Sequence, residues 1–526
     1  MKSSLGILGV GLLLMGCGSD DEGNAAEPGG EERGVGSLVG LSPVEKLVYT
    51  LGGPDGFQNI QGLSITATGS RWLPHEGASP DAPPVLANEF ERTVSMIPAN
   101  DFLRVDVERD IEFLFPGPQA YSEILRGNLG VSTQPRFGAP LGDLTSDRVA
   151  AIQVQEMFLS PHLLVSRLGA GIEEDIDVAI DGALYHRLQI EAAQTIYLFV
   201  EAATGLLARI DTLEHDFYRR DVVTSVAFEG WQSTESGVAY PSSVRLSRDD
   251  LLLLEQEVTS FEVNPDFDAD TFQFPAESAP VFDAALFARG GRSNQWYFLL
   301  ESIGLPFTGI DTMVNAVEVA PGVRQLQGAS HHSFLVEQAA GLVLVDAPLY
   351  QDRSGALLDY IEANFANKPI THVVASHFHE DHVAGIREVL GATDAVLVVH
   401  ESTADFWRET IEARSTIYPD ALARSPRQVE ILTVPDGDSL TLEDTAHPVE
   451  LFDMNATHAN DLLLTRDVTS NTVFVVDIYS PGNGTPFEPE TLDATILDND
   501  IPTDTLKIVG GHGNEQHAYT DLEAFL

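Results

Sequence analysis

The stretch Ser376-His377-Phe378-His379-Glu380-Asp381-His382 places four ligand-type side chains within six residues, directly after the apolar, strand-like segment 372–375. In an extended segment, residues two apart point the same way, so His377 and His379 share one side. The turn that follows can bring Asp381 and His382 to a second point nearby. Imidazole and carboxylate groups bind zinc and other first-row ions such as iron and manganese. The stretch therefore predicts two neighbouring metal sites at the end of a strand.

The surrounding region has the sequence pattern of a layered α/β domain. Eleven of the fifteen histidines lie after residue 330, an excess that also needs a functional reason. Strand-like and helix-like segments alternate here, beginning with the buried-type strand 341–346. A helix follows that strand, and we expect Ser354 to cap it. This alternation predicts one α/β domain over residues 312–526.

The motif His377-x-His379-x-Asp381-His382 resembles the signature of the metallo-β-lactamase superfamily. The resemblance covers about residues 319–526 and implies an αββα sandwich with a dinuclear metal site on one edge. It also implies the remaining site residues, each of which adjoins an apolar strand-like segment. These are His458, which completes the first site with His377 and His379; Asp477, which bridges both metals; His512, which joins Asp381 and His382 in the second site; and Asp346, which supports the site from outside the ligand set.

This ligand set predicts hydrolysis by activated water. Two zinc ions per chain are the expected cofactor, and iron or manganese accept the same ligands. Two such cations lower the pKa of a water from about 15.7 to near 7, so a metal-bridged hydroxide is the expected nucleophile. Asp381 would orient the hydroxide and accept its proton. Candidates for the leaving-group proton donor are Tyr479, His331 and His332, with packing or surface placement as the alternative for each.

Two departures from the family pattern bear on the substrate. Metallo-β-lactamases proper commonly carry Cys or Ser where this chain has Asp477, and the sequence places no Lys or Arg near Ser480 to meet a β-lactam carboxylate. Aspartate at this position is similar to glyoxalase II, lactonases and phosphodiesterases. We therefore expect a hydrolase of an ester, thioester, lactone or related bond in a small-molecule substrate. Phosphodiester or β-lactam hydrolysis, sulfatase-like chemistry and redox use of iron are alternatives on the same site.

The preceding region, residues 38–280, reads as a mainly antiparallel β domain. Apolar and charged residues alternate over 103–108, and Gly205 lies in a turn between two strand-like segments. A helix is expected near 147–157. The strand pattern resembles the half-barrel of bacterial lipoprotein carriers, which gives a second hypothesis: a lipid- or lipoprotein-binding protein with a structural metal domain. A linker over 281–311 would join the two parts.

The first residues resemble a bacterial lipoprotein signal. A basic start is followed by the apolar run 5–15. The residues at the end of this run, Leu14-Met15-Gly16-Cys17, are similar to a lipobox. The resemblance implies a signal peptide over 1–16, a lipid on Cys17 and a location in the bacterial cell envelope, anchored to a membrane. Residues 17–37 are rich in Gly and acids and are expected to form a flexible tether. Because Cys17 is the one cysteine of the chain, no intrachain disulfide and no thiolate zinc site can form.

Charge and length exclude other classes of protein. The 526 residues contain 29 Lys and Arg against 80 Asp and Glu, for a formal net charge of -51. Such a negative surface repels phosphate backbones, so we expect no nucleic-acid partner. With 43% hydrophobic residues, the chain can bury the cores of two or three domains. No pattern in the sequence indicates an oligomeric state.

Overall fold

The computed structural model describes residues 38–113, 116–132, 142–192, 194–216, 218–290, 312–365, 367–484 and 486–526. The signal peptide, the lipid on Cys17 and the tether lie outside the described residues, as does most of the expected linker, and they stay predictions. Residues Leu41–Leu526 form one compact unit. Within the described ranges, no helix combines the length and the apolar composition needed to cross a membrane.

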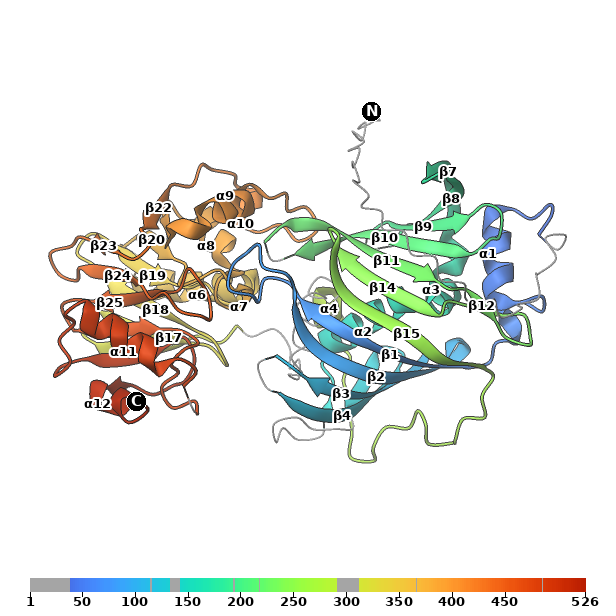
Figure 1. Cartoon of the computed structure of the whole chain (residues 1–526), viewed down its shortest axis with the longest axis horizontal. Helices are drawn as coiled ribbons and strands as arrows, with labels where there is room; N and C mark the ends of the chain where they lie inside the picture. Colours follow the sequence, from blue (N-terminus) through green and yellow to red (C-terminus); the bar gives the residue numbers. More distant parts are fainter. Residues whose placement is uncertain are drawn as a thin grey trace, which may run out of the picture. The chain divides into compact units, whose positions relative to one another are not determined.

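The first half of this unit is built on one 13-stranded antiparallel sheet (Figure 1). Its order is β6-β5-β4-β3-β2-β1-β15-β14-β11-β10-β9-β8-β7, and β12 and β13 form a separate pair. The strands are β1 (Leu63–Leu73), β2 (Val85–Ile97), β3 (Phe102–Ile111), β4 (Gly117–Arg126), β5 (Leu129–Ser132), β6 (Gly142–Asp143), β7 (Ile172–Ile180), β8 (Ala183–Ile190), β9 (Ile196–Glu201), β10 (Leu207–Asp216), β11 (Arg220–Glu229), β12 (Gln232–Ser233), β13 (Ala239–Tyr240), β14 (Ser243–Arg248) and β15 (Leu251–Val263).

Helices pack against the large sheet and complete its hydrophobic core. The expected helix near 147–157 is present as α2, and the expected hairpin is formed by β9 and β10, with Gly205 at a φ of 72°. Apolar side chains of α1, α2 and α3 share one buried cluster with the strands. The helices are α1 (Pro43–Gly52), α2 (Ser146–Leu159), α3 (Pro161–Leu168) and α4 (Ala284–Gly290), with short 3-10 turns η2 (Phe57–Asn59), η3 (Pro98–Asn100) and η4 (Gly169–Gly171). The mainly antiparallel β domain predicted from the sequence is therefore confirmed.

The second half contains two further sheets. One has seven strands in the order β16 to β22, and the other has six strands in the order β23 to β28. The strands are β16 (Asn315–Ala320), β17 (Val323–Gln327), β18 (His332–Glu337), β19 (Leu342–Val345), β20 (Ile370–Val374), β21 (Val396–His400), β22 (Ile431–Val434), β23 (Ser439–Leu442), β24 (Val449–Asp453), β25 (Leu463–Asp467), β26 (Thr472–Val475), β27 (Lys507–Gly510) and β28 (His517–Ala518).

Successive side chains of a strand point to opposite faces of its sheet, and this alternation separates two cores in the second half. On β19, Val343 and Val345 belong to the core that both sheets share, whereas Leu342 and Leu344 belong to the core between the seven-stranded sheet and its helices. The rings of Phe334 and Phe474 stack 5.3 Å apart and join the two sheets, a contact worth about 0.5–1.5 kcal/mol beyond its buried area. The αββα sandwich predicted for this region is confirmed.

The helices of the second half cover the outer faces of the two sheets. They are α6 (Gln351–Phe365), α7 (Glu380–Val383), α8 (Ile386–Ala392), α9 (Ala404–Glu412), α10 (Ala421–Arg424), α11 (Pro489–Asp498) and α12 (Tyr519–Glu523), with the 3-10 turn η5 (Glu401–Thr403). The expectation that Ser354 caps α6 is wrong. The helix already begins at Gln351, and Ser354 lies inside it, fully buried against Gly385.

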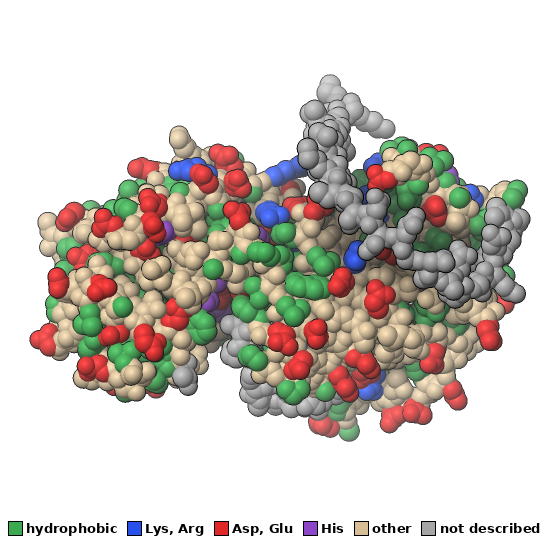
Figure 2. All heavy atoms as spheres, in the orientation of Figure 1, with side chains coloured by type: hydrophobic (Ala, Val, Ile, Leu, Met, Phe, Trp, Pro, Cys, Tyr) green, Lys and Arg blue, Asp and Glu red, His purple; other side chains and the backbone are tan. Residues whose placement is uncertain are grey.

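The two halves share buried contacts. Tyr218, in the turn between β10 and β11, lies in the helix-side core of the second half, and its hydroxyl donates a hydrogen bond to the carbonyl of Phe378. Asp420 accepts hydrogen bonds from Arg387 and lies 3.5 Å from Nε of Arg220, a residue of β11. Acidic side chains are spread across the visible surface, and Lys and Arg are few there (Figure 2).

Candidate metal centre

The chemistry-bearing residues lie where strands end. Asp346 follows β19, and His377 follows β20, which runs parallel to β19. Asp477 follows β26, and His512 follows β27, which is parallel to β26. The carboxyl ends of parallel strands meet at one edge of a sheet. Asp346 and Asp477 have φ values of 63° and 56°, a left-handed backbone that aspartate tolerates better than most residues.

A first group contains His377, His379, His458 and Asp477, whose ligand-type atoms lie within 4.8 Å of one another. Nε2 of His377 and Nε2 of His458 each lie 3.2 Å from Oδ2 of Asp477. The His379 ring donates from Nε2 to the carbonyl of Gly77 at 2.9 Å, so its Nδ1 is the atom with a lone pair for a cation. These are the residues predicted for the first metal.

A second group contains His331, Asp381, His382 and His512. Nε2 of His382 and Nε2 of His512 lie 3.1 and 2.9 Å from Oδ1 of Asp477. The carboxylate of Asp477 thus faces the first group with one oxygen and the second group with the other. This is the arrangement expected of a ligand that two metals share.

The donor atoms of this centre fit divalent cations. Nε2 of His377, Nε2 of His458 and Oδ2 of Asp477 are buried and make no hydrogen bond among the described residues, and such buried polar atoms are costly unless a partner satisfies them. Nδ1 of His512 donates to the carbonyl of Ser330 at 3.0 Å, which orients Nε2 toward Asp477. The set of five imidazoles and two carboxylates suits zinc or iron.

Burial and charge set the protonation states of the centre. Burial, followed by the neighbouring His379, lowers the pKa of His377 well below its usual value. Burial also lowers the pKa of His379 to about 4. Burial acts the same way on His382, but the carboxylates of Asp477 and Asp381 outweigh it and raise the pKa of His382 well above its usual value. Without a cation, His382 therefore holds a proton at neutral pH, and His377 does not.

Metal binding is expected to release protons. A cation needs the lone pair on Nε2 of His382, so the proton held there must leave when the metal enters. Burial would lower the pKa of His458, but the carboxylate of Asp477 raises it above its usual value, so at pH 7 we expect about one to two protons per chain to be released. The apparent affinity should rise with pH until both rings are neutral without metal. Isothermal titration calorimetry in buffers of different ionisation enthalpy measures this release. A binding enthalpy that is independent of the buffer would contradict it.

Asp346 holds the loop that carries the metal-binding motif. Its Oδ1 accepts a hydrogen bond from the backbone N–H of Ser376 at 2.9 Å, and its Oδ2 accepts one from the Ser376 hydroxyl at 2.9 Å. Nδ1 of His382 lies 3.3 Å from the same Oδ2, so the ring presents Nε2 to Asp477. This placement matches the supporting role predicted for Asp346.

The three proton-donor candidates have different surroundings. His331 belongs to the second group and donates from Nε2 to Oδ2 of Asp381 at 3.0 Å. Nδ1 of His332 accepts a hydrogen bond from the N–H of Gly328. The hydroxyl of Tyr479 is hydrogen-bonded to the ring of His517 at 2.8 Å. Of these candidates, the structure brings His331 alone into a ligand-type group.

Sequence reasoning missed the contribution of the first half to this centre. The loop between β1 and β2 supplies the Gly77 carbonyl to His379, and Glu76 precedes it. The segment Pro74-His75-Glu76-Gly77 has no ligand spacing that indicates such a role. The contact joins residues 302 positions apart, a separation that local patterns do not report.

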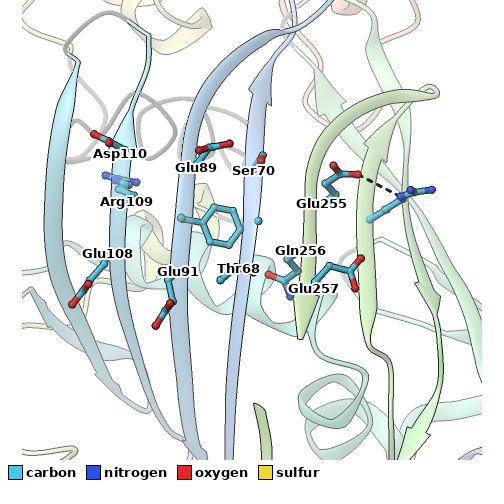
Figure 3. Close-up of a pocket in the computed structure, with 13 residues that line it drawn as sticks. Thr68, Ser70, Glu89, Glu91, Glu108, Arg109, Asp110, Glu255, Gln256 and Glu257 are labelled. Atoms are coloured by element: carbon cyan, nitrogen blue, oxygen red, sulfur yellow. Dashed lines mark ion pairs between the residues drawn. The ribbon is translucent and has the colours of Figure 1, made fainter. Parts of the chain in front are cut away.

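A separate hollow of about 700 Å³ lies on the large antiparallel sheet (Figure 3). It is lined by residues of β1, β2, β3, β14 and β15, and carboxylates are its most frequent side chains. Glu255 of β15 forms an ion pair with Arg245, its register partner on the neighbouring strand β14, at 3.6 Å. None of its lining residues belongs to either ligand group.

Known proteins resemble the second half of the chain. A family model described as the metallo-beta-lactamase superfamily matches residues 326–512. An (R)-specific secondary-alkylsulfatase from Pseudomonas sp is 26% identical over 162 residues, which are 30% of this chain and 24% of that protein, so the chain matches about a quarter of the relative's length.

Two solved structures cover the same share of the chain. A metallo-beta-lactamase from Pontibacter korlensis is 16% identical, with a TM-score of 0.31, over 40% of this chain and 96% of that one. A stereoselective inverting sec-alkylsulfatase from Pseudomonas sp. is 15% identical, with a TM-score of 0.31, over 40% of each chain. On the match to the family model, residues 326–512 form a domain of the metallo-β-lactamase superfamily.

Proposed function

We propose that this chain is a dinuclear hydrolase, with zinc as the expected ion, that cleaves ester, thioester or lactone bonds in a small-molecule substrate. The observation that carries the proposal is the position of Asp477, which presents one carboxylate oxygen to each of two histidine-rich groups. When bound, two divalent cations supply Lewis acidity and make water nucleophilic at neutral pH.

Asp381 and His331 are suited to handle the protons of this reaction. Burial would raise the pKa of Asp381, but the charge of His382 and the hydrogen bond from His331 hold it below its usual value, so Asp381 is ionised and can accept a proton. Burial lowers the pKa of His331 to about 4, so its ring is neutral at pH 7. The ring holds its proton on Nε2 toward Asp381, since Nδ1 lies 2.7 Å from the hydroxyl of Ser330, which can donate to it. The neutral ring therefore positions Asp381 through this hydrogen bond, and Asp381, once it has accepted a proton from the attacking water, can pass that proton to the leaving group.

The groups around the centre bear on which substrates it can meet. The largest charge effects on Asp381 and Asp477 come from histidines and from the carboxylates themselves, and no Lys or Arg is among them. An anionic group of a substrate would therefore meet the bound cations rather than a cationic side chain. The similarity to an alkylsulfatase supports sulfate esters as the second candidate.

Chelation and substrate class test the proposal together. We expect the purified chain to contain about two zinc ions, to lose turnover on chelation and to regain it when zinc is restored. Metal content is measured by inductively coupled plasma mass spectrometry, and turnover on neutral esters, thioesters, lactones, alkyl sulfates, phosphodiesters and β-lactams. Full activity in a metal-free preparation would overturn the proposal. Turnover of alkyl sulfates alone would select the second candidate.

A further inference from the structure

The loop between β1 and β2 contacts the two segments that carry the histidines of the first group. The Gly77 carbonyl accepts a hydrogen bond from Nε2 of His379 at 2.9 Å. The next carbonyl, that of Ala78, accepts one from the backbone N–H of Asn460 at 2.8 Å, two residues after His458. Two successive carbonyls of the first half therefore bind the two loops that supply the histidines of the first group.

The Gly77 contact fixes which nitrogen of His379 is available. A carbonyl can only accept, so the ring must carry its proton on Nε2. A neutral ring protonated there has its lone pair on Nδ1, which faces the other ligands of the group. Hydrogen bonds of this kind orient metal-binding histidines and raise their basicity.

A second contact holds this loop in place. The His75 ring is buried and packs edge-on against Tyr218, with ring centroids 5.3 Å apart and an interplanar angle of 85°. The Tyr218 hydroxyl donates to the carbonyl of Phe378, the residue before His379. The first half therefore contacts the motif at two successive residues, Phe378 and His379.

We propose that the segment 74–78 of the first half is an outer part of the metal centre, in which the Gly77 carbonyl positions His379 for metal binding. Through this segment, which connects β1 and β2, the large antiparallel sheet would contribute to metal binding. The proposal rests on the proposed function only in requiring that the chain bind metal.

Gly77 can be tested with a steric pair. A Cβ on Gly77 would lie 2.5 Å from Cβ of Ala82 and no closer than 3.9 Å to any other neighbouring atom outside residues 76–78. Gly77→Ala should therefore displace the carbonyl, and Ala82→Gly should restore it by removing the clashing atom. We expect Gly77→Ala to weaken zinc binding about 10–100-fold and the double variant to recover most of that loss. Ala82→Gly alone should bind as the wild type does.

Two measurements on the full chain separate positioning from general damage. Zinc affinity is obtained by competition with a chromophoric chelator, and the ¹⁵N shifts of His379 in the zinc-loaded protein report its tautomer. We expect the Nε2–H signature in the wild type and in the double variant, and its loss in Gly77→Ala. Equal zinc affinities in the wild type and Gly77→Ala, or no recovery in the double variant, would overturn the role of Gly77.

The zinc affinity of the wild type separates this proposal from the proposed function. A wild-type chain that binds no zinc would overturn both this proposal and the proposed function, whereas normal wild-type binding with unaffected variants overturns this proposal alone.

Discussion

Replacing Asp477 by asparagine should lower hydrolysis roughly a thousandfold or more and reduce the metal content to about one ion per chain or less. Its two oxygens lie 2.9–3.2 Å from four imidazole nitrogens, two in each group. Asparagine keeps the shape of the side chain but removes the charge and one of the two acceptor oxygens. The loss should therefore fall on both metals at once, unlike the loss of a histidine from one group.

The control for this variant is another aspartate with the same backbone. Asp500 has a φ of 51°, against 56° for Asp477, but it is exposed and belongs to neither ligand group. Asp500→Asn should retain both metals and full turnover. Metal analysis and rates on the preferred substrate compare the two variants. If Asp477→Asn retained two tightly bound ions, the bridging role would be wrong.

Replacing Asp420 by alanine should destabilise the chain by about 3–5 kcal/mol. Its side chain is 0% exposed and lies 2.7 Å from Nε of Arg387 and 3.5 Å from Nε of Arg220, and each of these arginine side chains is 2% exposed. Alanine would leave two buried guanidinium groups without their shared carboxylate. Because Arg220 belongs to the first half and Arg387 to the second, the contact between the halves should weaken as well.

Urea unfolding followed by tryptophan fluorescence measures this effect. Asp420 also caps α10 by accepting the N–H of Ala423 at 2.8 Å, and Asp420→Asn keeps an oxygen for that bond while it removes the charge. A large loss in both variants would assign the effect to the ion pairs. The exposed pair Asp405 and Arg408 provides the control, and Asp405→Ala should leave stability unchanged. Wild-type stability in Asp420→Ala would contradict the argument.

The residues that the structure brings together could be named from the sequence because the resemblance to the metallo-β-lactamase superfamily rests on short local motifs. His377, His458, Asp477 and His512 all adjoin short apolar segments, and the strand periodicity of those segments is visible without any tertiary information. The same resemblance implied Asp346. The structure brings these residues together because parallel strands end at one edge.

Other features depend on contacts that no local pattern encodes. Ser354 has the residue type of a helix cap, but tertiary packing starts α6 earlier and buries the hydroxyl. His331, His332 and Tyr479 could not be separated by sequence, because the difference lies in which partner each ring meets. Gly77 acts through a backbone carbonyl, which every residue possesses, so its identity carries no signal.

The Gly77 hydrogen bond also sets the order of events as the chain matures. Its partners are 302 positions apart, so during synthesis the carbonyl emerges long before the imidazole that it will orient. The fully oriented centre can form only after the large sheet has closed and the second half has docked on it. Contacts of such long range form late in folding because the entropy of closing the loop must be overcome first. We therefore expect high-affinity metal binding only in the last stage of folding, and a lower affinity for metal in a nascent or partly folded chain.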